Sequence, residues 1–286
     1  MPTLEELRAA IVECGRRLWD RGFVASNDGN ISVRLDDTRL LTTPTGVSKG
    51  FMAPDMMVVT DMDGRTLAGD RRPSSELKMH LEVYRQRPDV RAVVHAHPPT
   101  ATGFAVAGIP LDRAVLAEVI TTLGSIPIAE YATPSTEELP AAIRTHIRSH
   151  DGLLLANHGA LAVAGDLFGA YYRMETIEHF ARISLVARTL GREHVLSRGE
   201  VLRLQELREV YGISAPAPIC VTDAPADASS AGAPCQTVQA PDVVDRRLVP
   251  EATHGGVSGA GTEGEIRLTY RELTALIEDA VRHLRS

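Results

Sequence analysis

Cysteine is scarce in this chain, which has three among 286 residues. These three, Cys14, Cys220 and Cys235, lie far apart in the sequence, and no two of them form a Cys-x-x-Cys pair. A disulfide framework needs an even set of cysteines, and a thiolate zinc site needs closely spaced ones. The cysteines therefore indicate neither kind of site, and we assign them no function.

Long apolar runs and clusters of basic residues are also missing. No stretch approaches the roughly 18 apolar residues of a membrane-spanning helix, and the charged N-terminal stretch lacks the apolar core of a signal peptide. Lysine and arginine are scattered through a chain whose formal net charge is -7. Nucleic-acid phosphates are bound by clustered cations, which are absent here. We therefore expect a soluble, cytoplasmic protein that binds neither membranes nor nucleic acids.

The composition that is present predicts three parts. Hydrophobic residues make up 44% of the chain, enough for a substantial core, which we place in residues 1–212. Residues 213–264 are mostly Ala, Pro, Gly, Ser, Val and Asp without periodicity, which is typical of a disordered linker. Residues 265–286 combine a capping box, Thr269 with Glu272, and apolar residues at helical spacing. That pattern predicts an amphipathic helix on a tether.

Within the first part, helix and strand signals alternate irregularly. A capping box at Thr3 and Glu6 opens a helix that should end near Gly22, and a hairpin should turn at Asp63-Gly64. Further helices are expected over 99–106, from about Ser135 with a cap toward Glu138, and over 166–190. Hairpins early in the chain followed by helices predict an α/β sandwich with a mainly antiparallel sheet.

Two histidines stand out in the apolar stretch AVVHAHP. Because alternate side chains of a strand share a face, His95 and His97 should point the same way. A third, His158, interrupts the apolar run LLLANHGALAV, and Glu76 begins a predicted helix upstream. Each histidine alone could be a hydrogen-bonded core residue. Together they predict a site for Zn²⁺ with an exchangeable position, in which Glu76 is the fourth ligand or the base.

A second set of residues suits an anion. It joins small side chains, exposed backbone N–H groups and a helix N-terminus, where the helix dipole favours negative charge. Its members are Asn30, Thr45, Gly46, Ser74 and Ser75. Taken separately, each stretch is also what ordinary turns and helix caps use. The adjacency of Ser74-Ser75 to Glu76 favours a phosphate held beside the metal.

These motifs, in order and spacing, resemble the class II aldolase/adducin family. They are GNISVR, LTTPTGVSK, PSSELKMH, AVVHAHP, IPIAEYATPSTEEL and NHGALAVAGDL, and the similarity covers roughly residues 4–212. The resemblance implies a three-layer α/β/α sandwich and a homotetramer with sites at subunit interfaces. It implies one Zn²⁺ per subunit, Glu76 as ligand and acid/base, phosphate binding by the five residues above, and a catalytic Tyr211 that reaches a neighbouring subunit's site. The zinc ligands it implies are His95, His97, His158 and Glu76.

The activity implied by this resemblance is retro-aldol cleavage of a ketose 1-phosphate, such as L-fuculose 1-phosphate or L-rhamnulose 1-phosphate. The products would be dihydroxyacetone phosphate and a small aldehyde such as L-lactaldehyde. We expect burial beside a phosphate to raise the pKa of Glu76.

Alternatives within the family stay open. Its 4-epimerases carry aspartate at the Glu76 position, whereas its dehydratases and decarboxylases keep glutamate. The segment VLAEVITTLGSIP also lacks the catalytic tyrosine that one sugar-phosphate aldolase of the family carries there, and has Glu118 near that place. A metal-free, adducin-like scaffold is the non-enzymatic alternative, and the retained histidines and Glu76 argue against it.

The C-terminal helix lies outside this similarity. Residues 265–286 resemble the encapsulation peptides that carry enzymes into bacterial microcompartments. That resemblance implies shell proteins as partners and a location inside a microcompartment. The alternative is a helix that packs back on its own tetramer.

Overall fold

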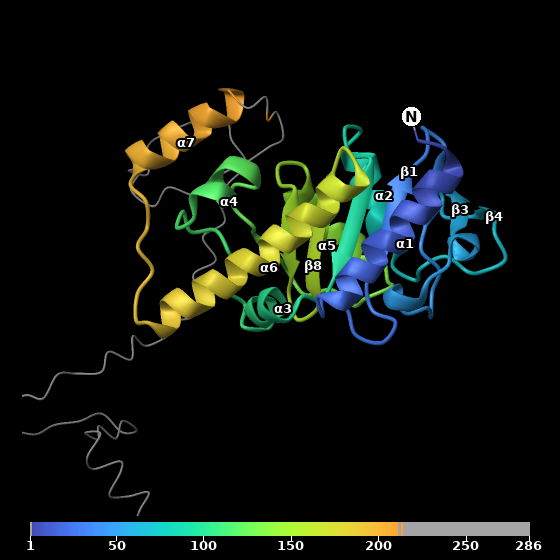
Figure 1. Ribbon diagram of the computed structural model, residues 1–286, viewed down its shortest axis with the longest axis horizontal. Coiled ribbons are helices and arrows are strands. Elements are labelled where there is room, and N and C mark those ends of the chain that lie inside the picture. Colours follow the sequence, from blue (N-terminus) through green and yellow to red (C-terminus); the bar gives the residue numbers. More distant parts are fainter. Residues whose placement is uncertain (1, 211–212, 214–286) are drawn as a thin grey trace, which may run out of the picture. The chain divides into compact units, whose positions relative to one another are not determined.

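A single eight-stranded sheet forms the middle layer of the computed structural model, which describes residues 2–210 and residue 213 (Figure 1). The strands follow the order β4-β3-β2-β1-β5-β8-β7-β6, and every neighbouring pair is antiparallel except β6 and β7. Their bounds are β1 Asn30–Arg34, β2 Arg39–Thr42, β3 Val58–Asp61, β4 Thr66–Ala68, β5 Ala92–Ala96, β6 Ile128–Ala129, β7 Gly152–Leu155 and β8 Gly159–Ala164.

Helices cover both faces of this sheet. One face packs against α1 (Leu4–Asp20), α3 (Pro99–Val106) and α6 (Leu167–Thr189), and the other against α2 (Leu77–Gln86) and α5 (Glu138–Ile147). Two helices, α4 (Ala117–Thr122) and α7 (Arg198–Val210), share a small apolar cluster of their own. Short 3-10 helices, η1 (Lys49–Phe51) and η2 (Pro54–Met56), pack against α1. The predicted three-layer α/β/α sandwich with a mainly antiparallel sheet is confirmed.

Local signals set several of these boundaries. The capping box of Thr3 and Glu6 is formed at the start of α1, and the side chain of Asp166 caps α6 by accepting from the N–H of Gly169. The expected cap at Ser135 is wrong. Ser135 has a φ of 65°, and the Thr136 hydroxyl, not that of Ser135, accepts from the N–H of Glu138. The helix α5 therefore begins without the predicted capping box.

The strand pleat decides which side chains face the α2 layer. In β5, Val93 packs in the apolar cluster shared with α2, whereas Val94 packs with α1 and α6. By alternation His95 points to the same side as Val93. The start of α2 and the end of β5 therefore place Glu76 and His95 on one side of the sheet.

Several predictions fall outside the described residues. These are the linker 213–264 apart from residue 213, the helix 265–286 and Tyr211. The division of the chain at residue 212 stays a prediction. Among the residues that the structure describes, no helix combines the length and the apolar character needed to cross a membrane.

Candidate active site

Three imidazoles converge at one end of the sheet. His95 lies within β5, His97 follows the last residue of that strand, and His158 lies in the turn between β7 and β8. One ring nitrogen from each lies within 4.8 Å of the others, and the ring centroids are 4.7 to 5.1 Å apart. His158 interrupts the predicted apolar run because Asn157 takes a left-handed φ of 55° and turns the chain just before β8. The turn brings the ring to the other two.

Hydrogen bonds at the far side of two rings fix their tautomers. The Nδ1 atom of His95 lies 2.9 Å from the carbonyl oxygen of Ala160, and that of His97 lies 3.3 Å from Oδ2 of Asp28. Both oxygens can only accept, so each Nδ1 carries the hydrogen and each Nε2 presents a lone pair. The two Nε2 atoms are 3.1 Å apart. Two lone pairs that face each other at this distance fit a shared cation between them.

Burial keeps the innermost ring neutral. His95 is completely buried, and this desolvation lowers its pKa to about 3. Desolvation also lowers the pKa of His97. Neutral imidazoles with free Nε2 atoms are the form that binds a metal. The residues present therefore fit a divalent ion of the zinc type.

Glu76, the residue that precedes α2, lies directly against these rings. Its Oε1 is 3.1 Å from Nε2 of His158, its Oε2 is 3.4 Å from Nε2 of His95, and the Asn30 amide donates to Oε2 at 2.8 Å. Burial on its own would raise the pKa of Glu76, but the two rings and the Asn30 amide together lower it below its ordinary value. The contacts in the structure therefore lower the pKa of Glu76, and the carboxylate is ionised at neutral pH. The predicted rise beside a bound phosphate stays a prediction.

The five predicted anion-binding residues gather beside Glu76. A β-bridge between Pro44 and Pro73 holds the segment with Thr45 and Gly46 against the segment with Ser74 and Ser75. The side-chain amide of Asn30 donates to the carboxylate of Glu76. The backbone N–H of Glu76 donates to the hydroxyl of Ser74 at 3.3 Å.

Two backbone N–H groups are open in this cluster. In the part of the chain that the structure describes, the N–H groups of Gly46 and Ser75 donate to no protein acceptor. Gly46 has a φ of 71°, a conformation that glycine adopts readily. These N–H groups are available to an anion at the N-terminus of α2.

Sequence reasoning missed two residues that contact this region, Asp28 and Lys49. Asp28 lies next to His97, and Lys49 is buried with its Nζ donating to backbone carbonyls. The only signal for Lys49 was a lysine three residues after the TPTG turn in a chain with two lysines. Asp28 gave no signal, because its partner is far away in sequence. Glu118 is exposed on α4.

Comparison with known proteins points the same way. Residues 9–185 match the family described as "Class II Aldolase and Adducin N-terminal domain". The chain is 33% identical to 5-deoxy-D-ribulose 1-phosphate aldolase of Bacillus thuringiensis serovar kurstaki, over 73% of this chain and 98% of that one. It is 33% identical to 3-oxo-tetronate 4-phosphate decarboxylase of Haemophilus influenzae, over 60% of this chain and 84% of that one. A solved structure of L-fuculose 1-phosphate aldolase superposes with a TM-score of 0.67 and 32% identity, covering 71% of this chain and 96% of that one.

Proposed function

Because this chain belongs to the class II aldolase and adducin family, we propose that it is a zinc-dependent lyase that breaks a carbon–carbon bond of a sugar phosphate. The observation that carries the proposal is the convergence of three imidazoles and the Glu76 carboxylate beside open backbone N–H groups. The relatives named above are aldolases and a decarboxylase, all of which break such a bond.

The proposed ligands of the zinc are His95, His97, His158 and Glu76. Bound zinc would act there as a Lewis acid that withdraws electron density from the carbonyl oxygen of the substrate. The Nδ1 hydrogen bonds of His95 and His97 keep both rings in the binding tautomer. Asn30 holds the carboxylate of Glu76 between the rings and the anion-binding segment.

The substrate phosphate would be bound at the N-terminus of α2. The open N–H groups of Gly46 and Ser75 would donate to its oxygens, together with the hydroxyls of Thr45, Ser74 and Ser75. A phosphate held there lies next to Glu76, because Ser74 already contacts the backbone of that residue. This position brings the first carbons of a short sugar phosphate to the carboxylate.

For a ketose 1-phosphate, we propose retro-aldol cleavage between C3 and C4. The C4 hydroxyl loses its proton, the C3–C4 bond breaks and leaves its electron pair on C3, and Glu76 delivers to C3 a proton that its ionised carboxylate first takes up from solvent. The products are dihydroxyacetone phosphate and an aldehyde, which is L-lactaldehyde when the substrate is L-fuculose 1-phosphate or L-rhamnulose 1-phosphate. Tyr211 of a neighbouring subunit is the proposed group that handles the proton of the C4 hydroxyl.

Decarboxylation of a 3-oxo acid phosphate is the second candidate. The observation that favours it is the missing tyrosine in residues 115–127, where fuculose-phosphate aldolase carries a catalytic one. Release of carbon dioxide leaves a carbanion, which the same zinc would stabilise and Glu76 would protonate. No aldehyde is formed in this reaction, so no proton donor or acceptor is needed at an aldehyde oxygen. The 33% identity to 3-oxo-tetronate 4-phosphate decarboxylase supports this candidate as much as the 33% identity to 5-deoxy-D-ribulose 1-phosphate aldolase supports the first.

A direct assay separates the candidates. Zinc-loaded protein is incubated with L-fuculose 1-phosphate, L-rhamnulose 1-phosphate, 5-deoxy-D-ribulose 1-phosphate and 3-oxo-tetronate 4-phosphate, and dihydroxyacetone phosphate and carbon dioxide are measured. Both reactions yield dihydroxyacetone phosphate, so release of carbon dioxide from 3-oxo-tetronate 4-phosphate assigns a decarboxylase, whereas dihydroxyacetone phosphate formed from a ketose 1-phosphate assigns an aldolase. Isomerised or dehydrated sugar phosphate would instead assign a 4-epimerase or a dehydratase, and a protein that binds no zinc and converts nothing would be a scaffold.

The variant Glu76→Gln tests the proposed acid/base role. Loss of the carboxylate should lower the rate of cleavage by about 10²–10⁴-fold, while zinc stays bound through the three imidazoles. Zinc content and turnover are measured on the same sample. A variant that turns over at the wild-type rate would remove Glu76 from the mechanism.

The assembly and its location are proposals that rest on the resemblance of the sequence. We propose a homotetramer in which Tyr211 completes the site of a neighbour, and docking of residues 265–286 on microcompartment shell proteins. Sedimentation should give a tetramer, and Tyr211→Phe should slow turnover in it. Deletion of 265–286 should leave activity intact and abolish co-purification with shell proteins. Loss of the tetramer on that deletion would instead show that the helix packs on its own assembly.

A further inference from the structure

Lys49 is a buried cation at the side of the candidate site. It is 1% exposed, at the start of η1, and among the described residues no carboxylate forms an ion pair with it. Its Nζ donates instead to the carbonyl oxygens of Asn27 at 3.1 Å and Val47 at 2.7 Å. Burying an ammonium group without an anion is costly, and this burial lowers the pKa of Lys49 to about 8. Such a cost indicates a specific task for the group.

The two carbonyls belong to the two halves of the candidate site. Asn27 precedes Asp28, whose carboxylate lies 3.3 Å from Nδ1 of His97. Val47 follows Gly46 in the predicted anion-binding segment. One ammonium group therefore links the segment that orients a metal ligand to the segment that offers an open N–H group to an anion.

The backbone of the first segment needs such a link. Ser26 and Gly29 have φ angles of 50° and 73°, both in the left-handed region. A Cβ atom at Gly29 would lie 2.9 Å from the carbonyl oxygen of His95, so this turn is pressed against the histidine strand. A residue such as Ser26 in this conformation is held by its surroundings.

Asp28 completes a carboxylate–histidine pair on the most exposed of the three rings. The side chain of His97 is 25% exposed, whereas His95 is fully buried and bonded to a backbone carbonyl. A partly exposed ring has more freedom to rotate, so a fixed acceptor on its Nδ1 matters most there. Such partners of metal-bound histidines affect metal affinity by about 10–100-fold.

We propose that Asp28 and Lys49 are positioning residues of this site. Asp28 fixes the ring of His97, and Lys49 holds the Asp28 segment and the Thr45-Gly46 segment together, so that one residue supports both metal and anion binding. The inference rests on the proposed metal and phosphate binding, and it does not depend on which reaction follows.

Two binding measurements on the full-length protein test it. Zinc affinity is measured by competition with a chromophoric chelator, and binding of inorganic phosphate to the zinc-loaded protein by isothermal titration. Asp28→Ala should weaken zinc binding by about 10–100-fold and leave phosphate binding nearly unchanged. Lys49→Met should weaken both, because both segments lose their common anchor.

Matched controls are available in the chain. Lys78 is the only other lysine, half-exposed and paired with Glu137, so Lys78→Met should change neither affinity. Asp36→Asn removes an exposed carboxylate away from the rings. Asp28→Asn keeps an acceptor for Nδ1–H and should retain most of the zinc affinity that Asp28→Ala loses.

A spectroscopic signature is independent of activity and of Lys49. Nitrogen-15 NMR of labelled histidine should show His97 as the Nδ1–H form in wild-type protein and a mixture of tautomers in Asp28→Ala. If Lys49→Met fails to fold, this comparison together with the zinc affinity of Asp28→Ala still decides the role of Asp28.

The failures are distinguishable. If wild-type protein binds no zinc, the proposed function falls. If wild-type protein binds zinc and phosphate and both Asp28→Ala and Lys49→Met match it, only the positioning roles are overturned. A Lys49→Met variant that loses one affinity and keeps the other would refute the link between the two halves.

Discussion

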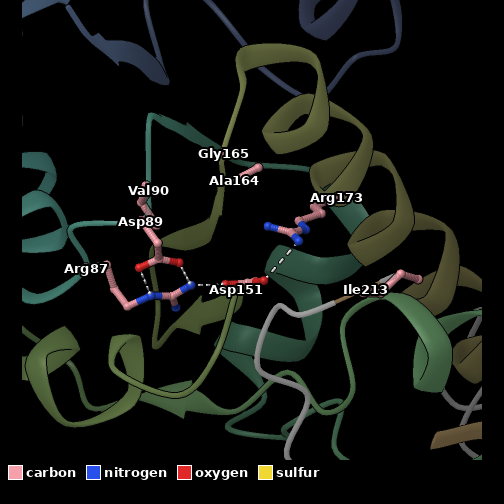
Figure 2. Close-up of a pocket in the computed structure, with 8 residues that line it drawn as sticks. All are labelled: Arg87, Asp89, Val90, Asp151, Ala164, Gly165, Arg173 and Ile213. Carbon is pink, nitrogen blue, oxygen red and sulfur yellow. Dashed lines mark hydrogen bonds and ion pairs between the residues drawn. The ribbon is translucent and has the colours of Figure 1, made fainter. Parts of the chain in front are cut away.

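The two ends of the central sheet both bury charged and titratable groups, but they differ in what those groups still lack. At the end of β7 and β8 away from the histidines, Arg87 contacts Asp89 at 2.6 Å and Asp151 at 2.9 Å, and Arg173 contacts Asp151 at 3.0 Å (Figure 2). These groups line a cavity of about 330 Å³ together with Ile213. Each charge there faces an opposite one.

The histidine end is not satisfied by its own residues. Nε2 of His95 and Nε2 of His97 face each other at 3.1 Å as acceptors, and Nδ1 of His158 is buried without a hydrogen-bond partner. A buried charge network alone is therefore a poor sign of function, because the arginine and aspartate end has one and needs no ligand. Converging acceptors without a donor are the better sign, because a bound cation would satisfy all of them at once.

Removing a metal ligand should cause the largest loss of zinc and of turnover. If it did not, the contrast between the two ends of the sheet would fail. His158→Gln takes away one of the three rings from a turn rather than from the core of the sheet. Zinc as a Lewis acid contributes several kcal/mol to transition-state stabilisation, so turnover should fall by about 10³-fold or more. Zinc per chain and turnover are measured together, and a variant that keeps both would contradict the assignment.

The same kind of change at the other end should act on stability alone. Asp151→Asn leaves Arg87 and Arg173 without their shared buried carboxylate, which should lower the free energy of unfolding by about 3–5 kcal/mol. Urea unfolding measures this, and zinc content per folded chain should not change. The exposed pair of Asp36 and Arg39 is the control, and Asp36→Asn should leave the free energy of unfolding nearly unchanged. Loss of zinc in Asp151→Asn at unchanged stability would reverse the roles of the two ends.

Acid should weaken the fold through two buried neutral histidines, His80 beneath Glu76 and His150 beside Asp151. Burial lowers the pKa of each to about 4. Between pH 6.5 and 4 the unfolded chain therefore binds more protons than the folded one, so stability falls as the pH falls. The slope should reach about 1.4 kcal/mol per pH unit for each histidine.

Urea unfolding of metal-free protein across this pH range measures the slope. His80→Gln and His150→Gln should each flatten the curve. A wild-type curve without slope between pH 6.5 and 4 would mean that the two rings are already charged in the folded protein.

Much of the fold could be predicted where the cause is local. The bounds of α3 were predicted to the residue, and α1 and α6 within a residue or two, because Thr3, Asp166 and Pro99 act on backbone groups a few residues away. The cap of α5 was mispredicted because Thr136, the neighbour of Ser135, provides the same chemistry one residue later.

The sequence was enough to predict which residues form the metal site, but not how they are arranged. Histidines in apolar stretches are costly, so His95, His97 and His158 could be chosen from sequence. The turn at Asn157 was hidden by apolar residues on both sides of it. Asp28 could not be found, because only the folded sheet brings it close to His97. The function of Lys49 could not be found, because its partners are backbone carbonyls, which every residue has. The lowered pKa of Glu76 depends on contacts with His95, His158 and Asn30, which are far from it in sequence.

X-ray absorption at the zinc edge of purified full-length protein tests the central claim most directly. The account predicts one zinc per chain with only nitrogen and oxygen neighbours, imidazole scattering from three histidines, and Zn–N distances of about 2.0–2.1 Å. The imidazole signal should weaken in His158→Gln. Protein without stoichiometric zinc after metal loading, or zinc bound through sulfur, would contradict it.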